Sequence, residues 1–364
     1  MLDATAILAK IGIHRLRPPS HSTVLEEISE FGFNPGNLRM FRYVPGSVAP
    51  KPALMVVLHG CTQSAASYDA GTGWSRLAER YGFSLLFPEQ QRANNPNGCF
   101  NWFQPADVQR GRGEVASIKS MIDRCQRDQG TERVFITGLS AGGAMTSAML
   151  ACYPEMFAGG AIIAGLPFGG AGDVRQAFEM MSVSPSRPAE EWGNLVRRAS
   201  RHSGPWPRIS IWHGGADTTV VPANAKEILK QWMNVHGVSD ASMSQGKRDG
   251  IPRLIWKNQA GDEVIEFYNI PHMAHGTPLA TGSKYGEVAG PFMLETGISS
   301  SYQIANFFGL IDLEILAAAA APHIALPERK MSVPSGAFAQ RSAASKRIDV
   351  GAVIADALKA AGLR

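Results

Sequence analysis

Short apolar runs, each ending in small or polar residues, recur along the first 270 residues of the chain. They are ALMVVLHG (53–60), FSLLFPE (83–89), RVFITG (133–138), GGAIIAG (159–165), RISIWHG (208–214) and EVIEFYNI (263–270). Runs of this length without a regular polar face are typical of strands buried on both faces of a sheet. We therefore predict a strand at each of them.

Helical patterns lie between most of these runs. Residues 113–127 form the clearest one, because their apolar side chains recur at helical spacing: Val115, Ile118, Met121, Ile122 and Cys125. Residues 141–152 and 222–236 are further predicted helices. Strands that alternate with helices predict a mostly parallel sheet covered on both faces, with ligands beyond the carboxyl ends of the strands.

Residues 166–207 interrupt the alternation. This stretch carries two predicted helices, around 173–181 and 188–202, and several prolines: Pro185, Pro188, Pro205 and Pro207. Prolines punctuate chains at turns rather than inside helices. We expect a lid-like insertion that forms a wall of the site.

The two ends of the chain differ from its middle. We expect an N-terminal extension (1–34), one α/β catalytic domain (35–317) and a C-terminal tail (318–364). The tail is rich in Ala, Ser and Pro, a composition typical of linkers. It ends in a predicted short helix that Asp349 can cap.

A serine among glycines follows the third apolar run. Gly138, Ser140 and Gly142 spell G-x-S-x-G, the pattern that puts a nucleophilic serine on a sharp strand-to-helix turn of an α/β-hydrolase fold. The same residues also suit a plain turn in which the serine only caps the helix. The presence of partner groups decides between the two interpretations.

A nucleophilic serine needs a base to take its proton and an acid to orient that base. In this fold they follow in the order Ser, acid, His, each after a strand. Asp217 follows the fifth run, and His272 and His275 follow the sixth. Gly276 leaves the His275 imidazole on a flexible turn, which favours His275; His272 is the alternative. A lone loop Asp or His is more often a cap or a surface residue, but the order of the three favours a triad.

Two backbone amides are candidates for the oxyanion hole that acyl transfer requires. One belongs to Ala141, the residue after the serine. The other belongs to Cys61, which follows the His-Gly turn at the end of the first run. The role needs only the amide, so the simplest interpretation of the Cys61 side chain is a small buried hydrophobe.

Composition narrows the range of partners. The net charge of +4 and the pI of about 8.9 are too weakly basic to favour nucleic acid. The chain has no apolar run long enough to predict a membrane span. Its cysteines, at positions 61, 99, 125 and 152, lack the spacing of a zinc site, so we expect no metal.

Seven separated motifs resemble, in family order, the short-chain poly(3-hydroxybutyrate) depolymerases and their feruloyl and acetylxylan esterase relatives. They are LHGCTQSA, NGCFNWF, RGRGEVASI, VFITGLSAGGAMT, YPEMFAGGAIIAGLPFG, WPRISIWHGGADTTVVPANA and QWMNVHG. The resemblance covers roughly residues 35 to 310. It implies an α/β-hydrolase fold with Ser140 as nucleophile, Asp217 as acid, His275 as base, and the Cys61 and Ala141 amides as oxyanion hole. It also implies a disulfide between Cys61 and Cys99; two reduced, buried thiols are the alternative.

The resemblance further implies a cofactor-free serine esterase that acts through an acyl-enzyme on 3-hydroxybutyrate polyester or its oligomers. A feruloyl or acetylxylan-type esterase is the alternative and, from another class, a non-catalytic polyester or carbohydrate binder. The tail is too short and polar for a polymer-binding domain, so we expect soluble oligomers or small acyl esters. The family favours an extracellular enzyme, whereas the N-terminus lacks a recognisable secretory signal, which favours the cytoplasm.

Overall fold

A ten-stranded sheet forms the centre of the protein. The computed structural model describes residues 24–48 and 50–311. The strand order is β1 (Glu26–Ile28), β2 (Arg39–Tyr43), β4 (Ser84–Glu89), β3 (Leu54–Leu58), β5 (Val134–Leu139), β6 (Gly159–Ile163), β7 (Arg208–Gly214), β10 (Glu263–Ile270), β9 (Ile251–Lys257) and β8 (Met243–Arg248). All of the strands predicted from apolar runs are present.

The middle of the sheet is parallel and its two margins are antiparallel. Strands β4, β3, β5, β6, β7 and β10 pair in parallel, and β1, β2, β9 and β8 extend the sheet in antiparallel fashion. The predicted mostly parallel sheet of an α/β-hydrolase fold is confirmed. Because the parallel strands point the same way, the loops after β3, β5, β7 and β10 meet at one edge.

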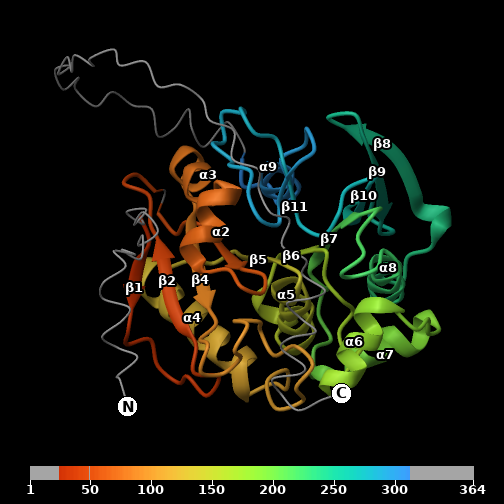
Figure 1. The fold of residues 1–364 in the computed structure, drawn as a ribbon, viewed down its shortest axis with the longest axis horizontal. Coiled ribbons are helices and arrows are strands. Elements are labelled where there is room, and N and C mark those ends of the chain that lie inside the picture. Colours follow the sequence, from red (N-terminus) through yellow and green to blue (C-terminus); the bar gives the residue numbers. More distant parts are fainter. Residues whose placement is uncertain (1–23, 49, 312–364) are drawn as a thin grey trace, which may run out of the picture.

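Helices cover both faces of the sheet (Figure 1). One face carries α4 (Gly113–Gln129), α5 (Ala141–Cys152) and α8 (Ala223–His236), and the other carries α2 (Ala65–Thr72), α3 (Trp74–Tyr81) and α9 (Ser300–Phe307). Successive residues of β3 alternate between the faces: Leu54, Val56 and Leu58 join one core, and Met55 and Val57 the other. A strand buried on both sides must be apolar throughout, which is why β3 reads as one apolar run.

The insertion at 166–207 packs against the body of the protein. Its helices are α6 (Val174–Ser182) and α7 (Ala189–Ala199), close to the predicted ranges. Trp192 of α7 is fully buried, and its indole donates a 2.6 Å hydrogen bond to Glu227 of α8. The backbone amide of Val221 donates to the carbonyl of Met181, so the insertion also reaches the loop after β7.

The two ends of the chain are only partly described. Strand β1 lies in the stretch that we assigned to the N-terminal extension, and it pairs with β2. Residues 1–23 and the whole C-terminal tail, with the helix predicted after Asp349, lie outside the described residues. Within the described residues, no helix has the length and apolar character needed to cross a bilayer.

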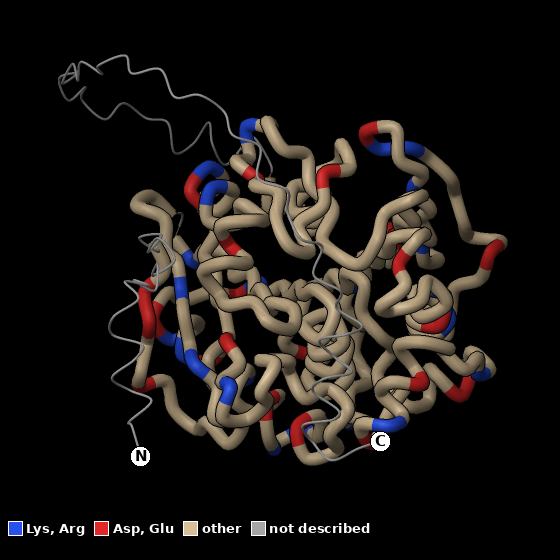
Figure 2. The backbone as a smooth tube through the Cα atoms, in the orientation of Figure 1, with Lys and Arg blue, Asp and Glu red and all other residues tan. Residues whose placement is uncertain are grey.

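Positions of Lys and Arg are interspersed with positions of Asp and Glu along the described backbone (Figure 2). At the β1–β2 margin they pair directly: Arg39 bridges Glu27 and Glu89, and Arg42 bridges Glu26 and Asp128. This pairing explains how β2, with two arginines in five residues, forms a strand that apolar patterning does not reveal.

Candidate active site

The loops after β5, β7 and β10 bring Ser140, Asp217 and His275 together. Ser140 directly follows β5, Asp217 lies just beyond β7, and His275 lies in the loop after β10. Nε2 of His275 is 2.9 Å from Oγ of Ser140, and Nδ1 of His275 is 2.7 Å from Oδ2 of Asp217. The carboxylate can only accept, so Nδ1 carries the proton and Nε2 is left to accept from the serine hydroxyl.

The turn that carries Ser140, residues 138–144, is called here the serine turn. Ser140 has φ +57° and ψ −117°, a strained conformation for a residue other than glycine. A Cβ at Gly142 would lie 2.5 Å from the carbonyl oxygens of Leu58 and His59, and one at Gly138 would lie 2.4 Å from the carbonyl oxygen of Gly142. The glycines of G-x-S-x-G therefore allow backbone segments to meet at distances that no side chain permits.

Asp217 is buried and fully hydrogen-bonded. Its Oδ1 accepts bonds of 2.9 Å from the backbone amides of Thr219 and Val220. Burial alone would raise the pKa of Asp217, but hydrogen bonds from His213 and His275 outweigh burial and hold the pKa well below that of a free aspartate. The carboxylate is therefore charged throughout the neutral range.

The loop that carries His275, residues 271–299, is called here the histidine loop. It contacts the end of β7, where the amide of Ala216 donates to the carbonyl of Met273 over 3.0 Å. The Phe292 ring meets the His275 ring edge to face, with centroids 6.1 Å apart. His272 lies in the same loop with φ +62° and an exposed side chain. The structure thus brings His275, of the two candidates, to the serine.

Glu287 joins separate parts of the histidine loop through hydrogen bonds. Its carboxylate accepts a 2.9 Å bond from the amide of Ala280 and a 2.7 Å bond from the hydroxyl of Ser299. Burial raises the pKa of Glu287 to about 7, against the effect of these two donors. This anchor therefore changes its charge near neutrality.

Cys61 lies in the β3–α2 loop, residues 59–64, beside the serine turn. A disulfide joins Cys61 to Cys99, and the amide of Thr62 donates a 2.7 Å bond to the carbonyl of Asn97. Ala141 begins α5 and is buried. Among residues 24–48 and 50–311, neither the Cys61 nor the Ala141 amide is bonded to a protein acceptor, which leaves both able to bind an oxygen.

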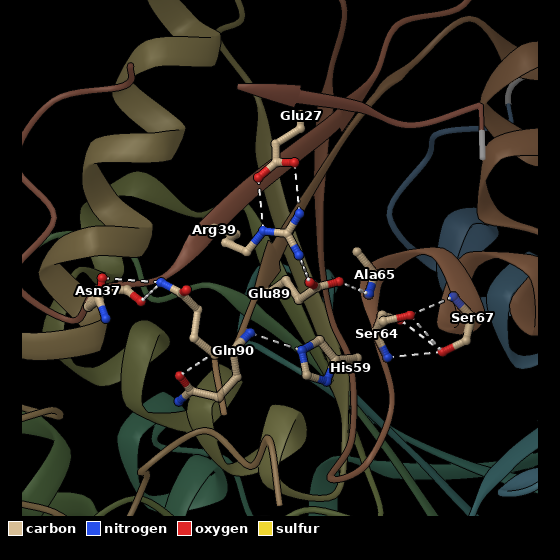
Figure 3. Close-up of polar contacts among 10 residues, drawn as sticks. Glu27, Asn37, Arg39, His59, Ser64, Ala65, Ser67, Glu89 and Gln90 are labelled. Carbon is tan, nitrogen blue, oxygen red and sulfur yellow. Dashed lines mark hydrogen bonds and ion pairs between the residues drawn. The ribbon is translucent and has the colours of Figure 1, made fainter. Parts of the chain in front are cut away.

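The β3–α2 loop is anchored at both ends by the end of β4 (Figure 3). The amide of Gln90 donates a 3.1 Å bond to Nε2 of His59, and the carboxylate of Glu89 accepts a 2.8 Å bond from the amide of Ala65. Arg39 in turn holds Glu89 with a 2.7 Å bond. In the described part of the chain, no cluster of His, Cys, Asp and Glu could hold a metal ion.

The sequence model of the family described as Esterase PHB depolymerase matches residues 39–253. The chain belongs to this family. It is 44% identical to poly(3-hydroxyalkanoate) depolymerase C of Paucimonas lemoignei over 79% of this chain and 70% of that protein. It is 38% identical to feruloyl esterase B of Neurospora crassa over 59% of this chain and 75% of that one. The resemblance drawn from the seven motifs is confirmed.

A solved structure of this wider group has the same fold. The acetyl xylan esterase from Aspergillus awamori matches with a TM-score of 0.67 at 26% identity, over 79% of this chain and 99% of that one. Like these relatives, this member of the Esterase PHB depolymerase family is a carboxylic ester hydrolase.

Sequence reasoning missed three residues that surround this group. His213, on β7, lies 3.4 Å from the carboxylate of Asp217, and the ring of Phe292 packs against His275. His213 lies inside one of the seven motifs, four residues before Asp217, so the sequence does carry a signal for it. No motif marks Phe292, because its contact with His275 forms only in the folded loop. His59 was noticed only as part of a turn, although a histidine at a buried strand end is itself an informative signal.

Proposed function

We propose that Ser140, His275 and Asp217 form the catalytic triad of a serine esterase. The observation that carries the proposal is the continuous chain of hydrogen bonds from the Ser140 hydroxyl through His275 to Asp217. The low pKa of Asp217 supports it, because an acid that stays charged stabilises the imidazolium formed during catalysis.

In the proposed mechanism, Oγ of Ser140 attacks the ester carbonyl carbon while Nε2 of His275 takes its proton. The amides of Cys61 and Ala141 bind the resulting oxyanion. The tetrahedral intermediate collapses, the C–O bond to the alcohol breaks, and the alcohol leaves with the proton from His275. Water then attacks the acyl-serine with His275 as base, and the carboxylic acid leaves as the proton returns to Oγ of Ser140.

The proposed substrate is an oligomer of 3-hydroxybutyrate. Support comes from sequence identity. The chain is 44% identical to the depolymerase of Paucimonas lemoignei and 38% identical to feruloyl esterase B of Neurospora crassa. Hydrolysis of methyl ferulate or acetylated xylan in preference to the oligomer would instead place the activity with the carbohydrate esterases. A product assay over all three substrates decides between them.

The triad is tested by Ser140→Ala and His275→Ala, with His272→Ala as the matched control from the same loop. We expect each of the first two variants to lower kcat for p-nitrophenyl butyrate by about 10⁴-fold or more. The control should keep wild-type kcat, because the His272 side chain is exposed. Full activity in Ser140→Ala, or loss in His272→Ala with activity retained in His275→Ala, would contradict the assignment.

A further inference from the structure

The direction of a backbone N–H group is set by its peptide plane and not by the side chain of its residue. The direction of the Cys61 N–H depends on the plane of the peptide that joins Gly60 to Cys61. Gly60 lies in a tight turn, where its amide donates to the Gln63 side chain over 2.8 Å. Some group must therefore fix that peptide plane against rotation.

The neighbouring side chain of His59 contacts this peptide directly. Its Nδ1 lies 2.8 Å from the carbonyl oxygen of Gly60, and its Nε2 lies 3.1 Å from the backbone nitrogen of Gln90. Figure 3 shows the second of these bonds, from the end of β4 to the imidazole. The ring is 1% exposed and packs on Phe100 with centroids 5.0 Å apart.

These two contacts determine the protonation state of the ring. A backbone N–H can only donate, so Nε2 of His59 must accept from Gln90. A carbonyl oxygen can only accept, so Nδ1 must carry the proton that bonds Gly60. The imidazole is therefore neutral and has one possible tautomer. Burial also lowers the pKa of His59 to about 4, which keeps the ring neutral at higher pH.

The peptide geometry carries the effect to Cys61. No cis peptide bond occurs in the described residues, so the carbonyl of Gly60 and the N–H of Cys61 point in opposite directions. A carbonyl held toward the buried imidazole turns the N–H away from it. We propose that His59 is a positioning residue, which relays a hydrogen bond from Gln90 to Gly60 and so aims the oxyanion-binding amide of Cys61. This inference rests on the proposed function, because it assigns an orienting group to the proposed oxyanion hole.

The end of β4 also holds the other side of the disulfide. The side-chain amide of Gln90 donates a 3.1 Å bond to the carbonyl of Cys99, the partner of Cys61. Gln90 thus fixes Cys61 from two directions, through His59 with its backbone and through Cys99 with its side chain. Of these two, only the contact through His59 acts on the Gly60 carbonyl. That carbonyl also accepts a longer bond of 3.3 Å from the amide of Gln63, so the shorter histidine contact should govern kcat.

Two substitutions separate the two bonds of the ring. The amide nitrogen of His59→Asn occupies the place of Nδ1 and can still donate to Gly60. The longer His59→Gln places its amide near Nε2, where it keeps the bond to Gln90 and loses the one to Gly60. We expect kcat for p-nitrophenyl butyrate to fall by about 10²- to 10³-fold in His59→Gln with little change in KM, and by less than about tenfold in His59→Asn.

A second readout follows the oxyanion itself. Butaneboronic acid forms a tetrahedral anion on a nucleophilic serine, so its inhibition constant should rise in His59→Gln in parallel with the loss of kcat. Thermal unfolding of both variants is measured alongside. An equal loss of kcat in the two variants, or full kcat in His59→Gln, would overturn the positioning role.

Ser140→Ala in the same assay keeps the two proposals distinguishable. Retained hydrolysis in Ser140→Ala overturns the proposed function, whereas its loss together with full kcat in His59→Gln overturns only the role of His59. If His59→Gln does not fold, imidazole nitrogen NMR of the wild-type protein still tests the relay. The His59 ring should be the neutral Nδ1–H tautomer from pH 5 to 9; any other form contradicts the proposal.

Discussion

The serine turn and the histidine loop bring the two partners of one hydrogen bond together by different means. The serine turn is short, and its position depends on backbone contacts at glycines: a Cβ at Gly142 would lie 2.5 Å from two carbonyl oxygens of the β3 end. The histidine loop is long and depends largely on contacts among its own residues. Its anchors include Phe292 against His275 and Glu287 on Ser299.

The difference indicates how far each of the two regions can move. Backbone packed on backbone leaves the serine turn little room to move. The histidine loop also packs on glycine backbone, at Gly214, but it is longer and depends in addition on side-chain contacts, so its alignment with the serine is easier to disturb. Variants of each region should therefore fail in different ways: loss of folding and activity together in the turn, and loss of kcat without unfolding in the loop.

The largest effect is expected from Gly142→Ala in the serine turn. The added methyl group would collide with the carbonyls of Leu58 and His59, so the start of helix α5 must move away from the end of β3. We expect unfolding to become easier by about 2–4 kcal/mol and kcat to fall at least ~100-fold, measured by thermal unfolding and ester hydrolysis.

Gly290→Ala is the matched control in the histidine loop. A Cβ at Gly290 would meet nothing within 4 Å, so stability should stay within about 0.5 kcal/mol of wild type. Equal effects of Gly142→Ala and Gly290→Ala would remove the contrast between the two regions.

A smaller effect is expected where the histidine loop meets β7. A Cβ at Gly214 would lie 2.3 Å from the carbonyl oxygen of Met273 and 2.6 Å from that of Ala274, so Gly214→Ala should displace the loop. We expect kcat to fall by about 10- to 100-fold with a smaller change in KM. Gly215→Ala is the control, because its Cβ would make only ordinary contacts, the nearest at 3.4 Å. A normal kcat in Gly214→Ala would show that the loop tolerates displacement.

The smallest effect concerns the pH dependence of stability. Burial raises the pKa of Glu287 in the folded protein to about 7, above its ordinary value of 4.5. A raised carboxyl pKa means that the folded state binds the proton more tightly, so this stabilisation is present below pH 4.5 and is lost as pH rises through 7. Glu287→Gln should flatten the fall of Tm across this range by a few degrees. Parallel curves of Tm against pH for wild type and variant would contradict the expectation.

The centre of the fold was predictable from sequence because its strands are buried on both faces. Strands β3, β5 and β7 read as apolar runs, and the order of Ser140, Asp217 and His275 followed from their places after strand ends. The margins were not predictable in the same way. All residues of β8 are exposed, so hydrophobic patterning carries no trace of it.

The finer features of the site depend on contacts that no local pattern records. The fold puts Nε2 of His275 2.9 Å from Oγ of Ser140 and leaves the His272 side chain exposed, a placement that the local sequence favours but does not fix. The role of Glu89 depends on Arg39 and Ala65, which lie on different elements and meet only in the folded sheet. Order along the chain predicts which groups take part; their alignment arises from tertiary packing.

The placement of the cysteines has a consequence for oxidative folding. In the unfolded chain all four thiols can exchange, and any two of them could join. Folding buries Cys125 and Cys152, and burial raises the pKa of each thiol to about 12. Exchange requires a thiolate, so these two cysteines stop being nucleophiles once the core forms. The packed core therefore protects the Cys61–Cys99 disulfide from exchange with the thiols of Cys125 and Cys152.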